Sequence, residues 1–502
     1  MEDYLQKILR ARVYDVAEET PLEKAKNLSE KFKNNIWFKR EDLQPVFSFK
    51  LRGAFNRMSQ LTKEELDKGV IASSAGNHAQ GVALSASFLK CRSVIVMPLT
   101  TPIMKVRAVE SHKAEVILYG ETYDECYEKA LEISKKENLT FIHPFDDPYV
   151  IAGQGTIGVE ILEQIDGDID AIFIPIGGGG LISGIATYVK ETKPNIKIIG
   201  VEPEDSSSMK LSLEANKPIT LDHVGIFADG VAVKRVGDIP FKLCKKYVDE
   251  IITVTTDETC AAIQAIYEQT RSIVEPSGAL SLAGITKYIS YHKNKNKTYV
   301  GINCGANVNF DRLRHIAERA AVGKQSEILL AVEIEEKPGS FKKFCDALGK
   351  RNITEFNYRY HNKASARVFL GLALHQGEHA HHEIINYLEK LNYSVMDLSQ
   401  NEMAKVHIRH MVGGRASIKN EQLFRFEFPE RPGALLGFLN AVGNEWNITL
   451  FHYRNHGSDF GRILTGIEAT STQMRKLEKH LSKLGYRYWK ENSNPAYGMF
   501  LA

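Results

Sequence analysis

The sequence AIFIPIGGGGLISGIATYVK, residues 171–190, decides the fold class of this chain. It begins with a short, almost continuously apolar run, which is typical of a strand buried on both faces of a parallel sheet. Four consecutive glycines (177–180) follow, and a helical pattern comes next. Because glycine has no side chain, an anion can reach the backbone N–H groups at the positive end of that helix. The stretch therefore predicts an α/β unit with an anion-binding loop, and its spacing suits a phosphate monoester better than a nucleotide.

Four further stretches have the same apolar character: SVIVM from Ser93, EVIL from Glu115, KIIGVE from Lys197 and TYVGIN from Thr298. Helical patterns lie between them, for example in 123–136 and 259–271. This alternation predicts an α/β architecture with parallel sheets for the first three-fifths of the chain.

The composition of the chain excludes several classes of protein. It has 502 residues and a net charge of +2, which gives no reason to expect nucleic acid or an anionic membrane as a partner. The uncharged stretch 171–189 is close to the length that a membrane helix needs, but it contains Pro175 and the four glycines, so we expect no membrane helix. Six cysteines without a C-x-x-C pair and an N-terminus without an apolar secretory segment predict a cytoplasmic protein with reduced thiols.

Beyond residue 326 the chain repeats itself. Glu336-Lys-Pro-Gly339 recurs as Glu430-Arg-Pro-Gly433, and FNYR (356–359) recurs as FHYR (451–454). Each copy predicts a strand, a Pro-Gly turn, a helix, two strands, a helix and a strand. We therefore expect three domains: 1–322 with two α/β subdomains, 326–400 and 421–495.

Two motifs near the N-terminus carry candidate chemistry. In SFKLRGA (48–54), Lys50 lies between aromatic and small residues, where its pKa could fall and make it a nucleophile. An isolated lysine is more often a solvated surface group. ASSAGNHAQG (72–81) follows a short strand and opens a helix, so its N–H groups could bind a substrate carboxylate. The alternative is a plain turn with a capping side chain.

Two later motifs are weaker when each is taken alone. EPSGA (275–279) could be a helix cap, and NCGAN (303–307) could be a turn that contains a buried structural thiol.

In this order, SFKLRGA, SAGNHAQG, GGGGL and NCGAN resemble the serine/threonine dehydratase family of fold-type II pyridoxal phosphate enzymes, from about Leu9 to the C-terminus. The resemblance implies a tryptophan synthase β-like catalytic fold and Lys50 as the lysine linked to pyridoxal 5′-phosphate. It assigns the rest of the cofactor site to Asn77, Gly177, Gly178, Gly179, Gly180, Leu181 and Cys304. It assigns the substrate site to Ser74, Ala75, Gly76, Asn77 and His78.

The family implies an activity for these residues. We expect dehydration and deamination of L-threonine to 2-oxobutanoate and ammonia, the committed step of isoleucine biosynthesis, with L-serine as a secondary substrate. Racemases of the family typically carry a second acid/base serine where this chain has Ala75, which favours dehydration over racemisation. The alternatives are a serine-preferring dehydratase, another β-eliminase, or an amino-acid sensor without activity.

The two repeats resemble the ACT-like regulatory domains of this family. The resemblance implies feedback inhibition by isoleucine, opposition by valine, and a homotetramer. Tyr358 and Tyr453 are our candidates for the effector sites, with core packing as the alternative. We expect no metal: the histidines of HQGEHAHHE (375–383) read as a solvated face, although Glu202 and Asp205 lie where some relatives bind a divalent cation.

Overall fold

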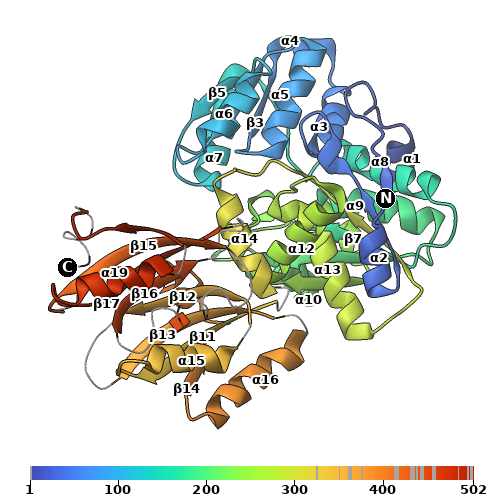
Figure 1. Cartoon of the computed structure of the whole chain (residues 1–502). Helices are drawn as coiled ribbons and strands as arrows, with labels where there is room; N and C mark the ends of the chain where they lie inside the picture. Colours follow the sequence, from blue (N-terminus) through green and yellow to red (C-terminus); the bar gives the residue numbers. More distant parts are fainter. Residues whose placement is uncertain are drawn as a thin grey trace. The chain divides into compact units, whose positions relative to one another are not determined.

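The chain folds into two compact units, residues 1–320 and 321–502 (Figure 1). The computed structural model describes residues 3–323, 326–349, 351–359, 365–374, 377–406, 408–411, 416, 418–429, 436, 439–440, 446–454, 460–483, 486–494, 497 and 501.

The larger sheet of the first unit has six strands in the order β1-β2-β10-β7-β8-β9. Every neighbouring pair is parallel except β1 with β2 at one edge. The strands are β1 (Leu22–Lys24), β2 (Asn35–Lys39), β7 (Ala171–Pro175), β8 (Lys197–Pro203), β9 (Glu250–Val254) and β10 (Thr298–Ile302). The parallel α/β architecture expected from the sequence is therefore confirmed.

Alternate residues of β7 supply two different cores. Ala171 and Phe173 belong to the core under α2, α12, α13 and α14, whereas Ile172 and Ile174 belong to the core under α8, α9, α10 and α11. A strand with side chains buried on both faces must be apolar throughout, which explains the unbroken AIFIPI run. The helices are α2 (Lys26–Phe32), α8 (Pro148–Gln164), α9 (Gly180–Thr192), α10 (Ser208–Glu214), α11 (Asp238–Tyr247), α12 (Thr256–Thr270), α13 (Pro276–His292) and α14 (Arg312–Gly323).

The helix expected at 259–271 begins three residues earlier, at Thr256. Thr255 and Glu258 form a reciprocal capping box: the Thr255 hydroxyl accepts from Glu258 N, and the Glu258 carboxylate accepts from Thr255 N. This pairing satisfies two N–H groups at the helix start and fixes the boundary.

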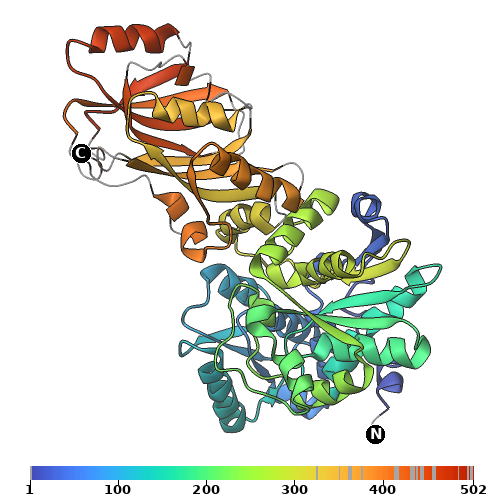
Figure 2. The same cartoon turned by 90° about the horizontal axis from the view of Figure 1, so that it is seen from below.

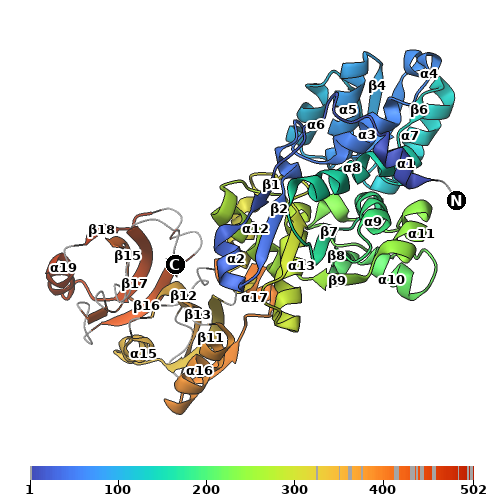
Figure 3. The same cartoon turned by 90° about the vertical axis from the view of Figure 1, so that its right-hand side faces the viewer.

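A smaller sheet has four parallel strands in the order β5-β4-β3-β6. Two of them, β4 and β6, are labelled in Figure 3. The strands are β3 (Val70–Ser73), β4 (Ser93–Met97), β5 (Glu115–Leu118) and β6 (Thr140–Phe141). The remaining helices of the first unit are α1 (Tyr4–Leu9), α3 (Lys50–Met58), α4 (Lys63–Lys68), α5 (Asn77–Leu89), α6 (Ile103–Glu110) and α7 (Tyr123–Glu137). Helix α3 packs on α5 and α8, so it connects the two sheets.

Helices α3, α8 and α9 approach one another closely at glycines. A Cβ atom at Gly153 would lie 2.6 Å from Arg52 O, and one at Gly184 would lie 2.4 Å from Ile151 O. Real Cβ contacts do not reach these distances, so the glycines are required for this packing.

The second unit contains one eight-stranded sheet in the order β14-β11-β13-β12-β16-β17-β15-β18. The first copy gives β11 (Glu327–Glu335), β12 (Ile353–Arg359), β13 (Ser365–Ala373) and β14 (Ser394–Asp397). The second gives β15 (Glu421–Pro429), β16 (Asn447–Arg454), β17 (Phe460–Glu468) and β18 (Arg487–Lys490). The copies meet at the antiparallel pair β12–β16, where Tyr358 lies opposite Phe451. Figure 2 shows the strands of both copies, in orange to red, side by side.

One face of this sheet carries the core of the second unit. Helices α15 (Ser340–Leu348), α16 (Gly377–Lys390) and α19 (Met474–Lys483) contribute to a single apolar cluster with the strands of both copies. Helix α17 (Glu402–Val406) contributes to a small cluster with Leu329 and Phe369. The Pro-Gly corner of the second copy, 430–433, lies outside the described residues. No helix in the described part of the chain is long and apolar enough to cross a membrane.

Candidate active site and effector pocket

Lys50 is the first residue of α3 and lies at the boundary between the two sheets of the first unit. Its Nζ donates to Pro144 O at 3.2 Å and lies 5.3 Å from the centre of the Phe49 ring. Burial lowers the pKa of the Lys50 amine to about 8, against the opposing pull of Cys304 and Glu275. With a pKa of about 8, about one such amine in ten is unprotonated at pH 7, far more than for an ordinary lysine, so Lys50 can act as a nucleophile and a base.

The glycine loop connects β7 to α9 and is closely surrounded on several sides. A Cβ atom at Gly178 would lie 2.3 Å from the Phe145 ring, and Gly179 has a positive φ of 94°. A Cβ atom at Gly177 would lie 3.0 Å from Val231 Cα. Side chains are thus excluded, while the backbone N–H groups at the start of a 13-residue helix stay available to a phosphate.

The start of α5 is a second candidate site for an anion. Ser74 Oγ accepts from Gly76 N at 3.2 Å, which fixes the turn. A Cβ atom at Gly76 would meet nothing within 4 Å, so there is open space in front of this turn. No described side chain caps the first turn of α5, and its N–H groups can therefore bind a carboxylate. Ala75 lies within the same turn.

A buried cluster around Glu275 connects three of the motifs. Asn77 Nδ2 donates to Glu275 Oε1 at 2.7 Å, and Asn307 N donates to Glu275 Oε2 at 3.1 Å. Asn307 Nδ2 also donates to Asn77 Oδ1 at 2.7 Å, and Ser277 Oγ donates to Glu275 Oε1 at 2.5 Å. Burial raises the pKa of the Glu275 carboxyl. The cluster fixes the orientation of the Asn77 amide.

Cys304 follows β10 and lies beside the start of α3. Its carbonyl accepts from Phe49 N at 3.3 Å, and Ser48 and Gly305 form an isolated antiparallel bridge. Burial keeps the pKa of the Cys304 thiol well above its usual range, so the sulfur stays protonated.

The His78 ring is buried, and its Nε2 donates to Ile142 O at 2.8 Å. Burial and the nearby Lys50 lower the pKa of His78 to about 3, so the ring is neutral and carries no charge for a substrate carboxylate. Leu181 also points inward: its side chain belongs to the core beneath the glycine loop.

Several buried polar atoms in these motifs have no hydrogen-bond partner among the described residues. They are Ser48 Oγ, Ser73 Oγ, His78 Nδ1 and both amide atoms of Asn303. Together with the amine of Lys50 and the glycine loop, they fit a site that binds a polar phosphorylated group with an aldehyde. The structure brings Lys50 close to Cys304, whose carbonyl contacts the neighbouring Phe49. Asn77 belongs to the Glu275 cluster. Lys50 contacts Pro144, and the next residue, Phe145, lies against the glycine loop.

Glu275 and Asn307 were not among the site residues expected from the sequence. A glutamate before a proline reads equally well as a helix cap, and the NCGAN motif drew attention to Cys304 instead. Their contacts to Asn77 span 198 and 230 residues, and no local pattern reports such pairs.

Glu202, one of the two acidic residues considered for a cation, has other contacts. Both carboxylate oxygens of Glu202 accept backbone N–H groups, from Met209 at 2.8 Å and Lys210 at 2.9 Å. Glu202 thus stabilises the start of α10. Within the described residues there is no group of three or more His, Cys, Asp or Glu placed to hold a metal ion; His375 lies outside them.

A small pocket of about 20 Å³ lies between the two copies in the second unit. It has room for about one water molecule. Tyr358 OH donates to Glu336 Oε2 at 2.6 Å in this pocket, and burial raises the pKa of the Glu336 carboxyl. Trp446, from the second copy, also lines it, and its buried Nε1 has no partner among the described residues. Tyr453 is buried on β16 opposite Phe356.

Two family descriptions match this chain. Residues 13–305 match the pyridoxal-phosphate dependent enzymes, and residues 318–408 and 412–501 each match the C-terminal regulatory domain of threonine dehydratase. The class defined by the fold and the site is therefore a pyridoxal-phosphate dependent enzyme with two regulatory domains.

Individual relatives narrow this class. The chain is 53% identical over 505 residues to the biosynthetic L-threonine dehydratase of Burkholderia multivorans, covering 100% of this chain and 99% of that protein. The chain belongs to the threonine dehydratase family of pyridoxal-phosphate dependent enzymes.

Solved structures agree with this placement. The processed form of threonine deaminase isoform 2 from Solanum lycopersicum is 53% identical with a TM-score of 0.62, covering 63% of this chain and 92% of that one. The serine racemase of Dictyostelium discoideum is 34% identical with a TM-score of 0.57, covering 61% of this chain and 99% of that one.

Proposed function

We propose that this protein converts L-threonine to 2-oxobutanoate and ammonia with pyridoxal 5′-phosphate, as the committed step of isoleucine biosynthesis, and accepts L-serine as a secondary substrate. The observation that carries the proposal is Lys50: a half-buried amine with a pKa of about 8, held between Pro144 and Cys304. The threonine dehydratases among the relatives support the choice of substrate.

We infer that Lys50 binds the cofactor aldehyde and that 177–180, with Leu181 N, holds its phosphate. The cofactor, when bound, delocalises the electron pair left on the α-carbon of the amino acid. Asn77 would donate to its phenolic oxygen, oriented by Glu275 and Asn307. Cys304 would lie beside the ring nitrogen. A neutral thiol does not hold a proton there as a carboxylate would, which favours prompt elimination over a long-lived carbanion.

The substrate carboxylate would lie at Ser74, Ala75 and Gly76, on the open side of the first turn of α5. His78 would contribute by holding that turn against Ile142 rather than by its charge. Nζ of Lys50, released by the incoming amino group, would take the α-proton as general base. The β-hydroxyl leaves as water, and uptake of one water releases ammonia and 2-oxobutanoate, so atoms and protons balance.

The position of Ala75 bears on the alternative of racemisation. A methyl group cannot return a proton to the opposite face of the α-carbon, whereas a serine hydroxyl could. Elimination therefore remains the favoured outcome, although a serine racemase is among the structural relatives.

The test is release of 2-oxo acid by the purified full chain with pyridoxal phosphate, from L-threonine and from L-serine. We expect 2-oxobutanoate at the higher rate, loss of turnover and of the visible band of the bound cofactor in Lys50→Ala, and no change in the exposed control Lys63→Ala. A higher rate on serine would favour the serine-preferring dehydratase. No turnover on either substrate would favour another β-eliminase or a sensor, and D-amino acid as main product would favour racemisation.

We also propose that isoleucine inhibits the enzyme through the second unit and that valine opposes it. The pocket at Glu336 offers an acidic acceptor for an ammonium group, the unpartnered Trp446 Nε1 as a donor for a carboxylate, and apolar walls from Ile334 and Ile448. Tyr358 lines this pocket, and Tyr453 would line the equivalent site of the second copy. Because the pocket holds only about 20 Å³, it must open to admit an amino acid.

Isoleucine titration of threonine turnover tests this regulation. We expect the rate of threonine turnover to fall sigmoidally with isoleucine concentration. This inhibition should be weaker in Tyr358→Phe and in Tyr453→Phe, and unchanged in Tyr387→Phe, whose side chain is 40% exposed on α16. An intact response in both Tyr358→Phe and Tyr453→Phe would remove these two tyrosines from the effector sites. A rate indifferent to isoleucine would remove the feedback assignment and leave the dehydratase.

The domain boundaries 1–322, 326–400 and 421–495 remain our proposal for the catalytic and the two regulatory domains. We further propose a cytoplasmic homotetramer. All six cysteines are free thiols, which suits a reducing compartment. The tetramer is implied by the family resemblance, and light scattering coupled to size-exclusion chromatography tests it.

A further inference from the structure

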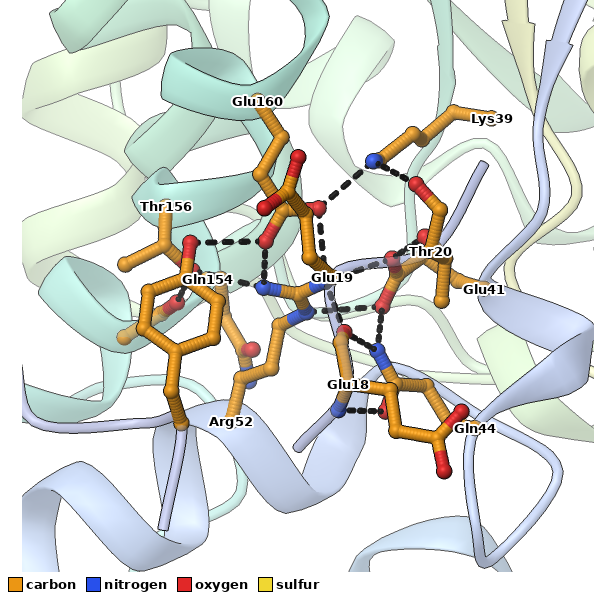
Figure 4. A network of polar contacts seen from close by, with 12 residues as sticks. Glu18, Glu19, Thr20, Lys39, Glu41, Gln44, Arg52, Gln154, Thr156 and Glu160 are labelled. Carbon is orange, nitrogen blue, oxygen red and sulfur yellow. Dashed lines mark hydrogen bonds and ion pairs between the residues drawn. The ribbon is translucent and has the colours of Figure 1, made fainter. Parts of the chain in front are cut away.

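Arg52 and three other buried charged residues form a cluster next to α3 (Figure 4). Arg52 and Lys39 supply two positive charges, and Glu41 and Glu160 supply two negative charges. Their side chains are at most 1% exposed. We call these four residues the Arg52 network. Its charges balance, which is the condition under which buried ions are tolerated.

The Arg52 guanidinium uses all of its N–H groups. Nε and Nη2 donate to the two oxygens of Glu41, both at 2.8 Å. Nη1 and Nη2 donate to the two oxygens of Glu160 at 2.5 and 3.0 Å. Thr156 Oγ1 and Glu18 O accept as well, each at 3.1 Å. A lysine has three N–H groups and no planar fork, so it cannot satisfy both carboxylates in this way.

The two glutamates are themselves held in place. Lys39 Nζ lies 2.5 Å from Glu160 Oε2, and Tyr14 OH donates to Glu160 Oε1 at 2.8 Å. Thr20 Oγ1 donates to Glu41 Oε1 at 2.5 Å. The segment before β1, the end of β2, α3 and α8 are thereby joined in one polar cluster.

Arg52, Glu41 and Glu160 are each close in sequence to residues in a different part of the candidate active site, or to residues that contact it. Arg52 follows Lys50 by two residues on α3, about 200° around the helix, so fixing one side chain directs the other to the opposite face. Next to Glu41, Asp42 N donates to Asn303 O at 2.9 Å, beside Cys304. Glu160 lies on α8, and the residues just before this helix include Pro144 and Phe145.

We propose that Arg52 is a positioning residue: through Glu41 and Glu160 it sets the first turn of α3 so that Lys50 Nζ stays between Pro144 and Cys304. The proposal rests on the proposed role of Lys50 as the cofactor-linked lysine. A misplacement of the reacting atom by about 1 Å can reduce a rate about 100-fold, so this position matters for catalysis. If Arg52 only stabilised the fold, its substitution would lower the resistance to unfolding and leave the position of Lys50 unchanged.

The comparison of Arg52→Lys with Arg57→Lys tests the proposal. Arg57 lies on the same helix and pairs with Asp147 at the start of α8, at 3.0 Å, but it is seven residues from Lys50. Both variants weaken an α3–α8 ion pair. The readout is the rate at which the visible band appears when cofactor-free protein is mixed with pyridoxal phosphate, measured from pH 6 to 11.

In Arg52→Lys we expect band formation to slow at least about tenfold. We also expect its pH midpoint to move up from about 8 and kcat on threonine to fall more than KM rises. Arg57→Lys should match the wild type in rate and midpoint. Equal rates and midpoints in both variants, with a lower melting temperature in Arg52→Lys, would overturn the positioning role.

If Arg52→Lys does not fold, Glu160→Gln provides the second test, because it keeps the shape of the side chain and removes one charge of the network. We expect the same slower band formation and raised midpoint, and wild-type values would overturn the proposal. A wild-type protein that forms no band, or a Lys50→Ala variant that keeps it, would instead contradict the proposed function itself.

Discussion

At single residues of the active site, burial acts on neighbouring groups in opposite directions. It lowers the pKa of the Lys50 amine to about 8 and raises the pKa of the Cys304 thiol, because both groups are favoured in their neutral form away from water. The same environment that makes Lys50 reactive thus keeps Cys304 unreactive. Glu275 is also buried, and it accepts hydrogen bonds from Asn77, Ser277 and Asn307.

Two histidines near this site, the buried His78 and the partly buried His143, predict that acid destabilises the protein. Burial lowers the pKa of His78 to about 3 and of His143 to about 4, while the unfolded chain titrates near 6.5. Between these values the unfolded state binds more protons, so stability falls as pH drops below 6.5. The loss is up to about 1.4 kcal/mol per pH unit for each histidine.

Urea unfolding at pH 7.5 and at pH 5.0 measures this effect. We expect the difference between the two free energies of unfolding to shrink in His78→Gln and to stay unchanged in His223→Gln, whose side chain is exposed. A pH difference that is the same in His78→Gln and in the wild type would show that His78 does not contribute.

At the scale of elements, the glycine loop depends on the segment just before α8. Phe145 lies against Gly178 and Gly180, and Pro144 accepts from Lys50. The loop, the lysine and α8 therefore share one wall of the site. A substitution in the loop, at the lysine or at the start of α8 should weaken cofactor binding even where the two sheets keep their structure.

Gly178→Ala tests this dependence. A Cβ atom 2.3 Å from the Phe145 ring forces a shift that costs about 1–3 kcal/mol, and we expect weaker retention of pyridoxal phosphate on dialysis. Gly158→Ala is the control: Gly158 lies on α8, and its Cβ atom would make ordinary contact with Ile185 of α9 at 3.4 Å. Equal retention of the cofactor in Gly178→Ala and Gly158→Ala would contradict the assignment of the phosphate to this loop.

At the scale of the whole molecule, the repeated copies of the second unit share one sheet and one apolar core. Strands β12 and β16 meet at its centre, so the pocket at Glu336 receives residues from both copies. A ligand that opens this pocket would act on the contact between the copies.

Hydrogen exchange of the full chain measures where an effector acts. We expect 1 mM L-isoleucine to slow amide exchange in β11, α15 and β16, because a ligand stabilises the state that binds it. Glu336→Gln should weaken this protection and leave threonine turnover without effector unchanged. Protection restricted to the active-site segments would indicate that isoleucine binds as a substrate analogue instead.

The sequence predicted the parts of this protein that depend on neighbouring residues. The strand before the glycine loop, the loop itself and the start of α5 follow from apolar runs and small residues within about twenty positions. The duplication was visible because the first copy has FNYR where the second copy has FHYR.

The remaining contacts could not be predicted because they join distant segments. Glu160 meets Tyr14 across 146 residues, and Arg52 across 108. Arg52 in SFKLRGA reads as an ordinary helix residue until the fold places Glu41 and Glu160 around it. Likewise, the sequence around Glu275 indicated only a helix cap, because its partners Asn77 and Asn307 are distant in the sequence.

The most direct test of the account is to locate the cofactor on the chain. The protein is incubated with pyridoxal phosphate, reduced with borohydride and digested, and the modified lysine is identified by mass spectrometry. We predict that the reduced cofactor lies on Lys50, and that L-threonine added before reduction decreases this labelling. Labelling of another lysine, such as Lys39 or Lys105, with Lys50 unmodified would contradict the central claim.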